Sequence, residues 1–438
     1  MSEVIICKLL DELWDSGDLP KLMEFAPEWL RVRREIGQVL AKAMGVPSRA
    51  DERWRYTSLS NVLRQGNFQH ADDGAVAQID KVPSHGLNVD AIPIVMVNGR
   101  LSAHLSDFTK IPNGLNVVSL ADAIIDELDG VNDLLSIGDE QEPNGIRAAN
   151  DGHIALGLLI RVDADAAIKI PIHIIVFETA EPQERMYHPR VVFDLERHTE
   201  LTVIESHLSN DGSGAIFKNW VSQISLADGA RLNHVKWQNE SKMANHVTTV
   251  DVKLLQDATY NAFIGLVGAS IARHDTRINV SGSGAHANVS GIYVGDGKQV
   301  HDFTTCISHN VPHTTSNQMV RGVLKRGARG VFLGKAIVAR DAQKTDAQQL
   351  HNALLLDKTA EVNAKPELEI YADDVQCAHG NTIGDVDTDA LFYMQARGIS
   401  KAEAYVLLIE GFLAEVVEHA VPAPLQDPVK AVVLEAIR

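Results

Sequence analysis

Cysteine is scarce in this sequence. Three cysteines, Cys7, Cys306 and Cys377, occur among 438 residues, and no two of them form a Cys-x-x-Cys pair. This excludes a disulfide framework and a ready zinc or redox motif, and it fits a reducing compartment. Aromatic residues make up only 5% of the chain, which is few for a protein that stacks sugar rings.

Positive charge is also in short supply. With 40 lysines and arginines against 58 aspartates and glutamates, the formal net charge is −18 at pH 7. Nucleic-acid binding needs clustered basic residues, so we expect no nucleic-acid partner. No apolar run approaches the ~18 residues of a membrane span, and the first residues lack the basic region and cleavage site of a signal peptide. We therefore expect a cytoplasmic protein that does not bind membranes.

The N-terminal region, residues 1–75, is predicted to be helical. After Pro27, which suits the first turn of a helix, apolar residues recur at three- and four-residue intervals as far as Gly45, a typical helix end. This spacing places them in one stripe along a helix face. The stripe consists of Trp29, Val32, Ile36, Val39, Leu40 and Ala43.

Residues 76–384 have the alternating pattern of strands. A polar turn, a small residue and an alternating strand recur in that order, with the small residue at Thr199, Ala230, Ala258, Ala285, Ala328 and Ala360. The spacings of 31, 28, 27, 43 and 32 residues are too irregular for a strict repeat, but they fit coils of a solenoid with loop insertions. An antiparallel sandwich would show similar short strands. The pattern therefore favours a parallel β-helix without excluding a sandwich.

Residues 385–438 return to helical patterns. Asp387 and Gly398 bracket a short helix, and the run from Ser400, Ser-Lys-Ala-Glu, has the spacing of a capping box that opens a longer helix. A last helix is predicted from Asp427-Pro428 to the C-terminus.

The middle helix of this region, from 401 to about 419, is apolar on more than one face. One stripe contains Tyr405, Leu408, Phe412 and Val416. Two interpretations remain open: the stripe packs against its own neighbours, or it is a docking surface for a partner.

Two glycine-rich segments resemble nucleotide-binding motifs. The run 330–336, Gly-Val-Phe-Leu-Gly-Lys-Ala, is one residue short of a P-loop and has alanine where Ser or Thr would bind Mg²⁺. The run 282–287 matches a loosened dinucleotide fingerprint, but a strand-like pattern follows it instead of a helix. We predict that both are β-turns, and that the chain has no ATPase site of its own.

A histidine-rich group also attracts attention. His301, Cys306, His309 and His313 place four potential ligands of Zn²⁺ or Fe²⁺ within 13 residues. However, their gaps fit no finger or ribbon. Because the chain holds 18 histidines, chance clustering is the preferred interpretation.

The most informative segment is 366–384. Its alternation predicts a strand, which places Cys377 and His379 two residues apart on one strand face. A thiolate and an imidazole so placed can approach one iron atom from the same side. Because iron–sulfur centres usually take four protein ligands, such a site would be partial and completed by another polypeptide. The alternative is a buried cysteine beside a structural histidine.

The run 368–384, Leu-Glu-Ile-Tyr-Ala-Asp-Asp-Val-Gln-Cys-Ala-His-Gly-Asn-Thr-Ile-Gly, resembles the signature of the SufB/SufD family of iron–sulfur cluster assembly proteins. The runs 390–399, 309–316, 330–334 and 354–360 resemble further blocks of the family. The element 52–57, Glu-Arg-Trp-Arg-Tyr-Thr, and the Cys-x-His-Gly form at 377–380 are similar to its SufD branch. Asn381 departs from the pattern, since alanine is commoner there.

The resemblance implies a fold and a role. The fold is a right-handed parallel β-helix core between N-terminal and C-terminal helical regions. The role is that of a non-enzymatic scaffold subunit, which pairs with a SufB-like paralogue through the β-helix and docks a SufC-like ATPase through the C-terminal helices. From the unpaired strand edges of a β-helix and the incomplete ligand set, we expect the isolated chain to form a homodimer without a stably bound cofactor. In the complex, iron or a nascent cluster would bind transiently at His379, with Cys377 as a second ligand.

Two alternatives come from other classes of protein. A β-helical polysaccharide hydrolase could use Asp373 and Asp374 beside His379, although the few aromatic residues speak against it. A purely structural scaffold would keep Cys377 and His379 as packed residues only.

Overall fold

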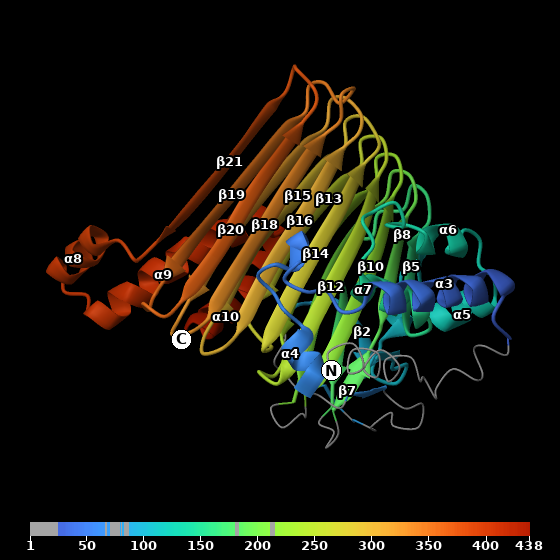
Figure 1. The fold of residues 1–438 in the computed structure, drawn as a ribbon, viewed down its shortest axis with the longest axis horizontal. Helices are drawn as coiled ribbons and strands as arrows, with labels where there is room; N and C mark the ends of the chain where they lie inside the picture. Colours follow the sequence, from blue (N-terminus) through green and yellow to red (C-terminus); the bar gives the residue numbers. More distant parts are fainter. Residues whose placement is uncertain are drawn as a thin grey trace.

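Two long β-sheets, here sheet A and sheet B, face each other and enclose a packed interior (Figure 1). The structure is a computed structural model, which describes residues 25–65, 68–70, 79, 81–82, 87–179, 184–210 and 215–438. Cys7 and the start of the predicted helical region lie outside the described residues.

Sheet A contains, in spatial order, β20 (Glu361–Ile370), β18 (Arg329–Val338), β16 (Val300–His309), β14 (Ile271–Val280), β12 (Ala244–Leu254), β10 (Ile216–Leu226), β8 (Arg190–Leu195), β5 (Gly157–Val162) and β4 (Leu115–Ser119), with β1 (Gln69–His70) and β7 (Arg185–Tyr187) beside them. Sheet B contains β21 (Gln376–Gly384), β19 (Asp346–Leu355), β17 (Thr315–Leu324), β15 (His286–Gly295), β13 (Thr259–Leu266), β11 (Arg231–Asn239), β9 (Glu200–Ser209), β6 (Ile172–Glu178), β2 (Ile92–Val97) and β3 (Arg100–Leu101).

Nearly all neighbouring strands are parallel, the exceptions being β2 with β3 and β4 with β5. Neighbours within a sheet are one coil apart, so that Thr259 pairs with His286, 27 residues further on, and Thr315 pairs with Asp346, 31 residues further on. Between them the chain visits the other sheet. The structure thus confirms the predicted parallel β-helix, and the antiparallel sandwich is excluded.

The small corner residues form two rows, not one. The row that precedes the strands of sheet B contains Thr199, Ala230, Ala258 and Ala285. Its next member is Thr314, a fully buried threonine that the sequence pattern missed. Ala328 and Ala360 precede strands of sheet A instead. The irregular spacing of 43 residues arose because the predicted series jumped from one row to the other.

The interior of the solenoid is packed with side chains. Tyr293 is fully buried there, and Gly330 leaves room for its ring, because a Cβ on Gly330 would lie 2.6 Å from ring carbon Cε2. The P-loop-like run 330–336 lies inside β18, so the predicted turn is wrong and the segment is a strand. Of the run 282–287, residues 282–285 form the turn before β15, as predicted, whereas His286 and Ala287 already belong to the strand.

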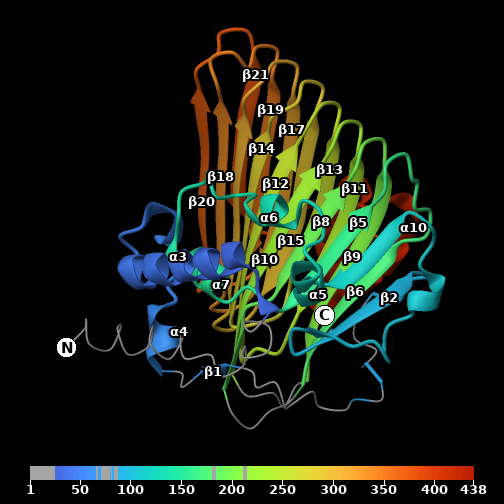
Figure 2. The same ribbon diagram turned by 90° about the vertical axis from the view of Figure 1, so that its right-hand side faces the viewer.

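Helices from the N-terminal half cover the outer face of sheet A (Figure 2). They are α3 (Glu28–Met44), η1 (Glu52–Trp54), α4 (Ser60–Gln65), α5 (Leu120–Ile125), α6 (Val131–Leu135) and α7 (Gly145–Gly152), while η2 (Phe108–Lys110) follows β3. Helices therefore continue well beyond residue 75, interleaved with the first strands.

Helix α3 ends at Gly45, whose φ of 68° suits a glycine. Apart from Trp29, its predicted apolar stripe does not face the core: the exposed fractions of Ile36 and Val39 are 53% and 61%. The helix instead buries the opposite side, where Gly37 meets α7 so closely that a Cβ would lie 2.5 Å from the backbone nitrogen of Gly152. Close approach of two backbones, and not apolar patterning, decides which face of α3 is buried.

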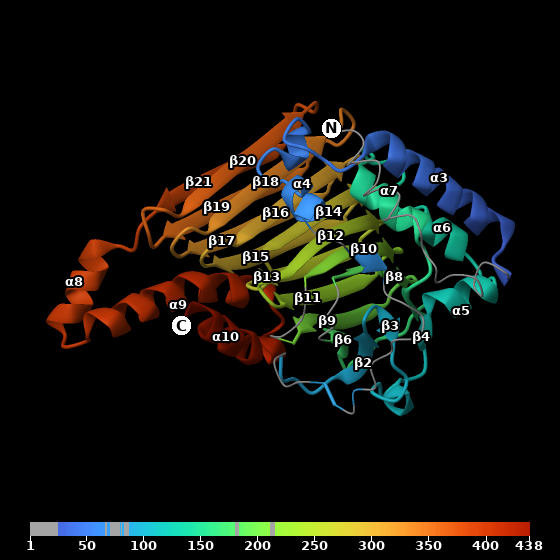
Figure 3. The ribbon, with the colours of Figure 1, turned by 60° about the horizontal axis from the view of Figure 1, so that its bottom comes forward.

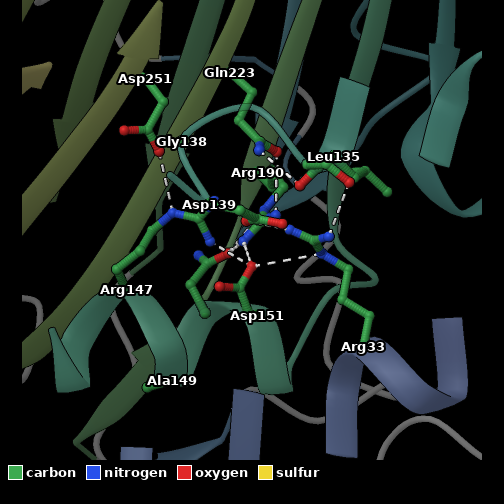
Figure 4. A network of polar contacts seen from close by, with 12 residues as sticks. Arg33, Leu135, Gly138, Asp139, Arg147, Ala149, Asp151, Arg190, Gln223 and Asp251 are labelled. Carbon is green, nitrogen blue, oxygen red and sulfur yellow. Dashed lines mark hydrogen bonds and ion pairs between the residues drawn. The ribbon is translucent and has the colours of Figure 1, made fainter. Parts of the chain in front are cut away.

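An ion network fastens these helices to sheet A (Figure 4). Asp151 of α7 lies 2.7 Å from a guanidinium nitrogen of Arg190 on β8, and it also pairs with Arg147 of its own helix. Arg147 reaches Asp251 of β12 at 3.2 Å, and Arg33 of α3 reaches Asp151 at 3.9 Å. The network thus joins two helices to two strands of the sheet.

The C-terminal helices α8 (Thr388–Ala396), α9 (Lys401–Ala420) and α10 (Ala423–Ile437) follow β21, and α9 lies against the outer face of sheet B (Figure 3). Asp387 and Ser400 cap α8 and α9 as predicted. The predicted start of the last helix is wrong: α10 begins one turn earlier, after Pro422, and Pro428 lies inside it. No helix in the described parts of the chain combines the length and the apolar character that crossing a membrane requires.

Candidate functional site at the terminal coil

The last coil of the solenoid, β20 and β21, is open on its outer side. Each strand pairs with one neighbour, β18 or β19, and no strand among the described residues covers its other edge. Most residues of β20 are half-buried and most of β21 are exposed, in contrast to the buried strands of earlier coils. A parallel β-helix whose terminal edge is uncovered presents free backbone donors and acceptors to another chain.

Cys377 and His379 both lie on β21, on one face of the strand as predicted. Cys377 pairs in register with Ala347 and packs, half-buried, against a small cluster with Val338 and Ala342. Burial raises the pKa of its thiol, which disfavours the thiolate that would bind metal. His379 is exposed. Of the two, His379 is therefore the more available ligand at neutral pH.

Asn381, the departure from the family pattern, has a structural role. Its Oδ1 accepts a hydrogen bond from Nδ1 of His351 at 2.7 Å, and Nε2 of His351 lies 2.9 Å from the hydroxyl of Tyr293. His351 also stacks on Phe332, with ring centroids 4.8 Å apart. Burial lowers the pKa of His351 to about 4, so the neutral ring can donate and accept at once. Asn381 on β21 is thus the last member of a hydrogen-bonded row that runs through His351 to Tyr293 in the interior.

The group His301, Cys306, His309 and His313 does not form a metal site. His301 and His309 point into the interior, where they bond to the carbonyl of Gly268 and to Thr314 with Ser316, respectively. Cys306 lies on the outer face of the same strand, near Arg53. His313 is exposed in the turn before β17. The alternation of a strand separates residues that are close in sequence, which supports chance clustering.

The apolar stripe of α9 divides between packing and exposure. Val416 is fully buried against sheet B, so it belongs to the core and is unavailable to a partner. Tyr405, Leu408 and Phe412 are half-buried at the margin of the same cluster. The ring of Phe412 lies under the guanidinium of Arg321, 4.7 Å from its centre. The docking role of these three residues remains a prediction.

A buried polar network inside the solenoid was missed by the sequence analysis. Glu205 and His207 continue the inward alternation of Leu201 and Val203 on β9, and both are fully buried. On the neighbouring strand β11, the register partner Lys236 lies 2.7 Å from Glu205. The sequence signal was the appearance of charged residues at positions whose parity demands an inward side chain.

Comparison with known proteins supports the family resemblance. Residues 177–412 match the family described as "SUF system FeS cluster assembly, SufBD core domain", and residues 21–174 match "SufBD protein N-terminal region". With the β-helix and its open terminal coil, these matches define a scaffold-type protein of iron–sulfur cluster assembly. The chain belongs to the SufB/SufD family.

Individual relatives point to the SufD branch. The chain is 32% identical over 378 residues to the iron–sulfur cluster assembly protein SufD of Escherichia coli, covering 85% of each protein. It is 28% identical over 272 residues to SufD of Bacillus subtilis, covering 61% of this chain and 62% of that protein. A SufBD family protein of Synechocystis is 27% identical over 406 residues, covering 90% of this chain and 88% of that protein. Membership of this family argues against the polysaccharide hydrolase alternative. Asp374, one of the two carboxylates of that alternative, forms an exposed ion pair with Lys344.

Proposed function

We propose that this chain is a SufD-like scaffold subunit of a cytoplasmic SufBCD-type complex and is not itself an enzyme. The observation that carries the proposal is the uncovered edge of β20 and β21, which bears His379. A SufB-like paralogue with a similar solenoid would pair with this edge and join the two β-helices. His379, with Cys377 behind it, would then lie at the subunit boundary.

Iron or a nascent cluster is the cargo of this boundary. His379 offers one imidazole nitrogen as a ligand, and the partner would supply the remaining ligands, because a single chain offers too few for a cluster. In our proposal, closure of two SufC-like ATPase subunits pulls on the C-terminal helices and shifts the boundary, so that the cargo is bound and released.

Co-purification tests the proposal directly. The full chain, expressed with its SufB-like and SufC-like neighbours, should elute as one complex that carries iron after anaerobic reconstitution. Elution of the chain alone, with the other two subunits together, would refute the scaffold role.

The isolated chain should be a homodimer in solution, because the edge that serves the paralogue is free for self-pairing. A charge placed on this edge, Ile383→Lys, should convert the dimer to a monomer without lowering the melting temperature of the fold. Ile383 is 41% exposed, and Ile170→Lys is a matched control because Ile170 is 49% exposed on another part of the chain. Light scattering that shows a monomer at tens of micromolar, or a dimer that Ile383→Lys leaves intact, would contradict this.

The ATPase should dock on the C-terminal helices through exposed side chains. On α8 no residue is buried, and the exposed fractions of Phe392 and Tyr393 are 72% and 59%. Phe392→Asp should therefore abolish ATPase binding with little change in stability. Phe412→Asp should lower the free energy of unfolding by about 2 kcal/mol, because Phe412 is half-buried and loses about half of what a fully buried aromatic side chain contributes. Pull-down and thermal melts on both variants check this, and unchanged ATPase affinity in Phe392→Asp would overturn the role of α8.

A further inference from the structure

A polar network crosses the interior of the solenoid near the early coils. Its ionisable members are buried to at least 96% of their surface and come from β6, β9, β10, β11, β12 and the turn after β11. They are Glu178, Glu205, His207, Lys218, His234, Lys236, Glu240 and His246. The structure thus commits three carboxylates and two ammonium groups to an interior whose other side chains are mostly apolar.

Three members form a metal-ligand geometry. Donor atoms of His207, Glu240 and His246 all lie within 4.8 Å of one another. The two imidazoles meet edge to face, with centroids 4.6 Å apart, and Nδ1 of His246 lies 2.7 Å from a carboxylate oxygen of Glu240. The other ring nitrogen of His246, Nε2, lies 2.6 Å from the hydroxyl of Thr248.

Lys218 lies beside two of these three residues. Its ammonium lies 2.6 Å from Glu240 and 3.4 Å from Nδ1 of His207, and 2.7 Å from Glu178, a further carboxylate. Glu240, His207 and Glu178 therefore already surround a cation. The other oxygen of Glu178, Oε2, is buried and has no hydrogen-bond partner among the described residues.

The charges of the network do not balance. Three carboxylates face two lysines, so full ionisation leaves one negative charge that a proton or an added cation has to neutralise. Two imidazoles with carboxylates are a ligand set for divalent first-row metals such as Fe²⁺, Co²⁺ and Zn²⁺. A divalent metal balances the three carboxylates together with Lys236 when Lys218 gives up its proton to solvent as the metal enters. Oε2 of Glu178, without a partner among the described residues, is an oxygen that such a metal can use.

We propose that this network is a second metal site, in which His207, Glu240 and His246, with Glu178 as a fourth ligand, bind one divalent first-row transition metal. Lys218 is the tethered cation that fills the site when no metal is present, and it competes with the metal for the same oxygens. The site is separate from His379 and does not depend on the proposed function.

Cobalt is the probe of choice, because bound Co²⁺ absorbs visible light. The reference protein is the full chain with Cys377→Ser and His379→Ala, which removes the terminal-coil ligands. Co²⁺ should raise its melting temperature and quench Trp220, whose ring lies 4.7 Å from that of His207. Thermal unfolding opens the core, so burial does not prevent the metal from reaching equilibrium.

Two variants of the reference protein then separate a metal site from a purely structural ion network. Lys218→Met removes the competing cation, so Co²⁺ should bind at least about tenfold more tightly and should restore the melting temperature that this variant loses in chelator. Glu240→Gln should abolish the visible absorption and the thermal shift. Asp302→Asn, which alters an equally buried carboxylate paired with Arg273 outside the interior, should respond to Co²⁺ as the reference does.

The proposal fails if Lys218→Met gains neither affinity nor stability from Co²⁺, or if Glu240→Gln binds Co²⁺ as the reference does. Should Lys218→Met be unfolded in chelator, refolding with Co²⁺ gives the same answer. Recovery of folded protein supports the site, and no recovery means that Lys218 serves only as a structural counter-ion.

Discussion

Replacing His379 with alanine is expected to strip the assembled complex of most of its iron while leaving the complex intact. The side chain is exposed on the terminal strand, so its loss should change stability by no more than about 0.5 kcal/mol. Loss of a ligand should instead reduce metal affinity by at least about 10- to 100-fold, since even replacing a residue that only hydrogen-bonds to a metal ligand has an effect of that size. Iron per complex and the melting temperature, measured on the same preparation, distinguish the two effects.

Two variants serve as controls for His379→Ala. Cys377→Ser should lower the iron content less, because burial raises the pKa of that thiol and half of the residue is packed against the coil. His313→Asn alters another exposed histidine, in a turn with a φ of 59° that asparagine tolerates, and should change nothing. Normal iron together with a lowered melting temperature in His379→Ala would show that the histidine is structural.

The sequence predicts the solenoid because its repeating unit is local. A small corner residue and an alternating strand recur with each coil, and the closing helices carry recognisable caps at Asp387 and Ser400. What the pattern could not reveal is which of the two sheets a given corner precedes. Ala285 and Ala328 look alike in sequence but lie in different rows, since a coil has two equivalent turns.

Inward charges and outward apolar residues are the features that local patterns miss. Lys218 and Glu240 are apart in sequence and pair only because the coils stack. Conversely, Ile36 and Val39 predict a buried helix face, yet α3 buries the side of Gly37, where backbones meet. The site at Cys377 and His379 was predictable in part, because strand parity places both on one face. His379 is exposed because β21 is the terminal strand of its sheet, and the sequence pattern did not show where the solenoid ends.

The second large effect concerns the attachment of the N-terminal helices. Asp151→Asn should destabilise the docking of α3 and α7 on sheet A by about 3 kcal/mol, because removing one partner leaves buried guanidinium groups uncompensated. Arg190 is fully buried, and its shortest contact to Asp151 is 2.7 Å. Hydrogen exchange along residues 28–44, together with urea unfolding, measures the loss where it is expected.

The pH dependence of this variant has a definite sign. Burial by itself would raise the pKa of Asp151, but Arg147, Arg190 and Arg33 outweigh it and bring the pKa down to about 2. Because the pKa of this carboxyl is lower in the folded than in the unfolded chain, its ionised form adds about 2 to 3 kcal/mol of stability at any pH above the unfolded-state pKa. This stability is lost as the pH falls from about 4 towards 2. The difference in stability between the wild-type protein and Asp151→Asn should therefore be full at pH 5 to 7 and shrink below about pH 4.

Asp139→Asn provides the matched control, since Asp139 lies 2.6 Å from the same Arg33 but its side chain is 47% exposed. Solvent-exposed ion pairs contribute about 0 to 1 kcal/mol, so this variant should unfold with the wild-type protein at every pH. If Asp139→Asn and Asp151→Asn prove equally mild, the buried network does not hold the helices. Their attachment would then rest on apolar contacts such as Leu30 and Ile124 against Val192. A loss confined to Asp151→Asn, largest at neutral pH, identifies the buried carboxylate as the group that fastens the N-terminal helices to the solenoid.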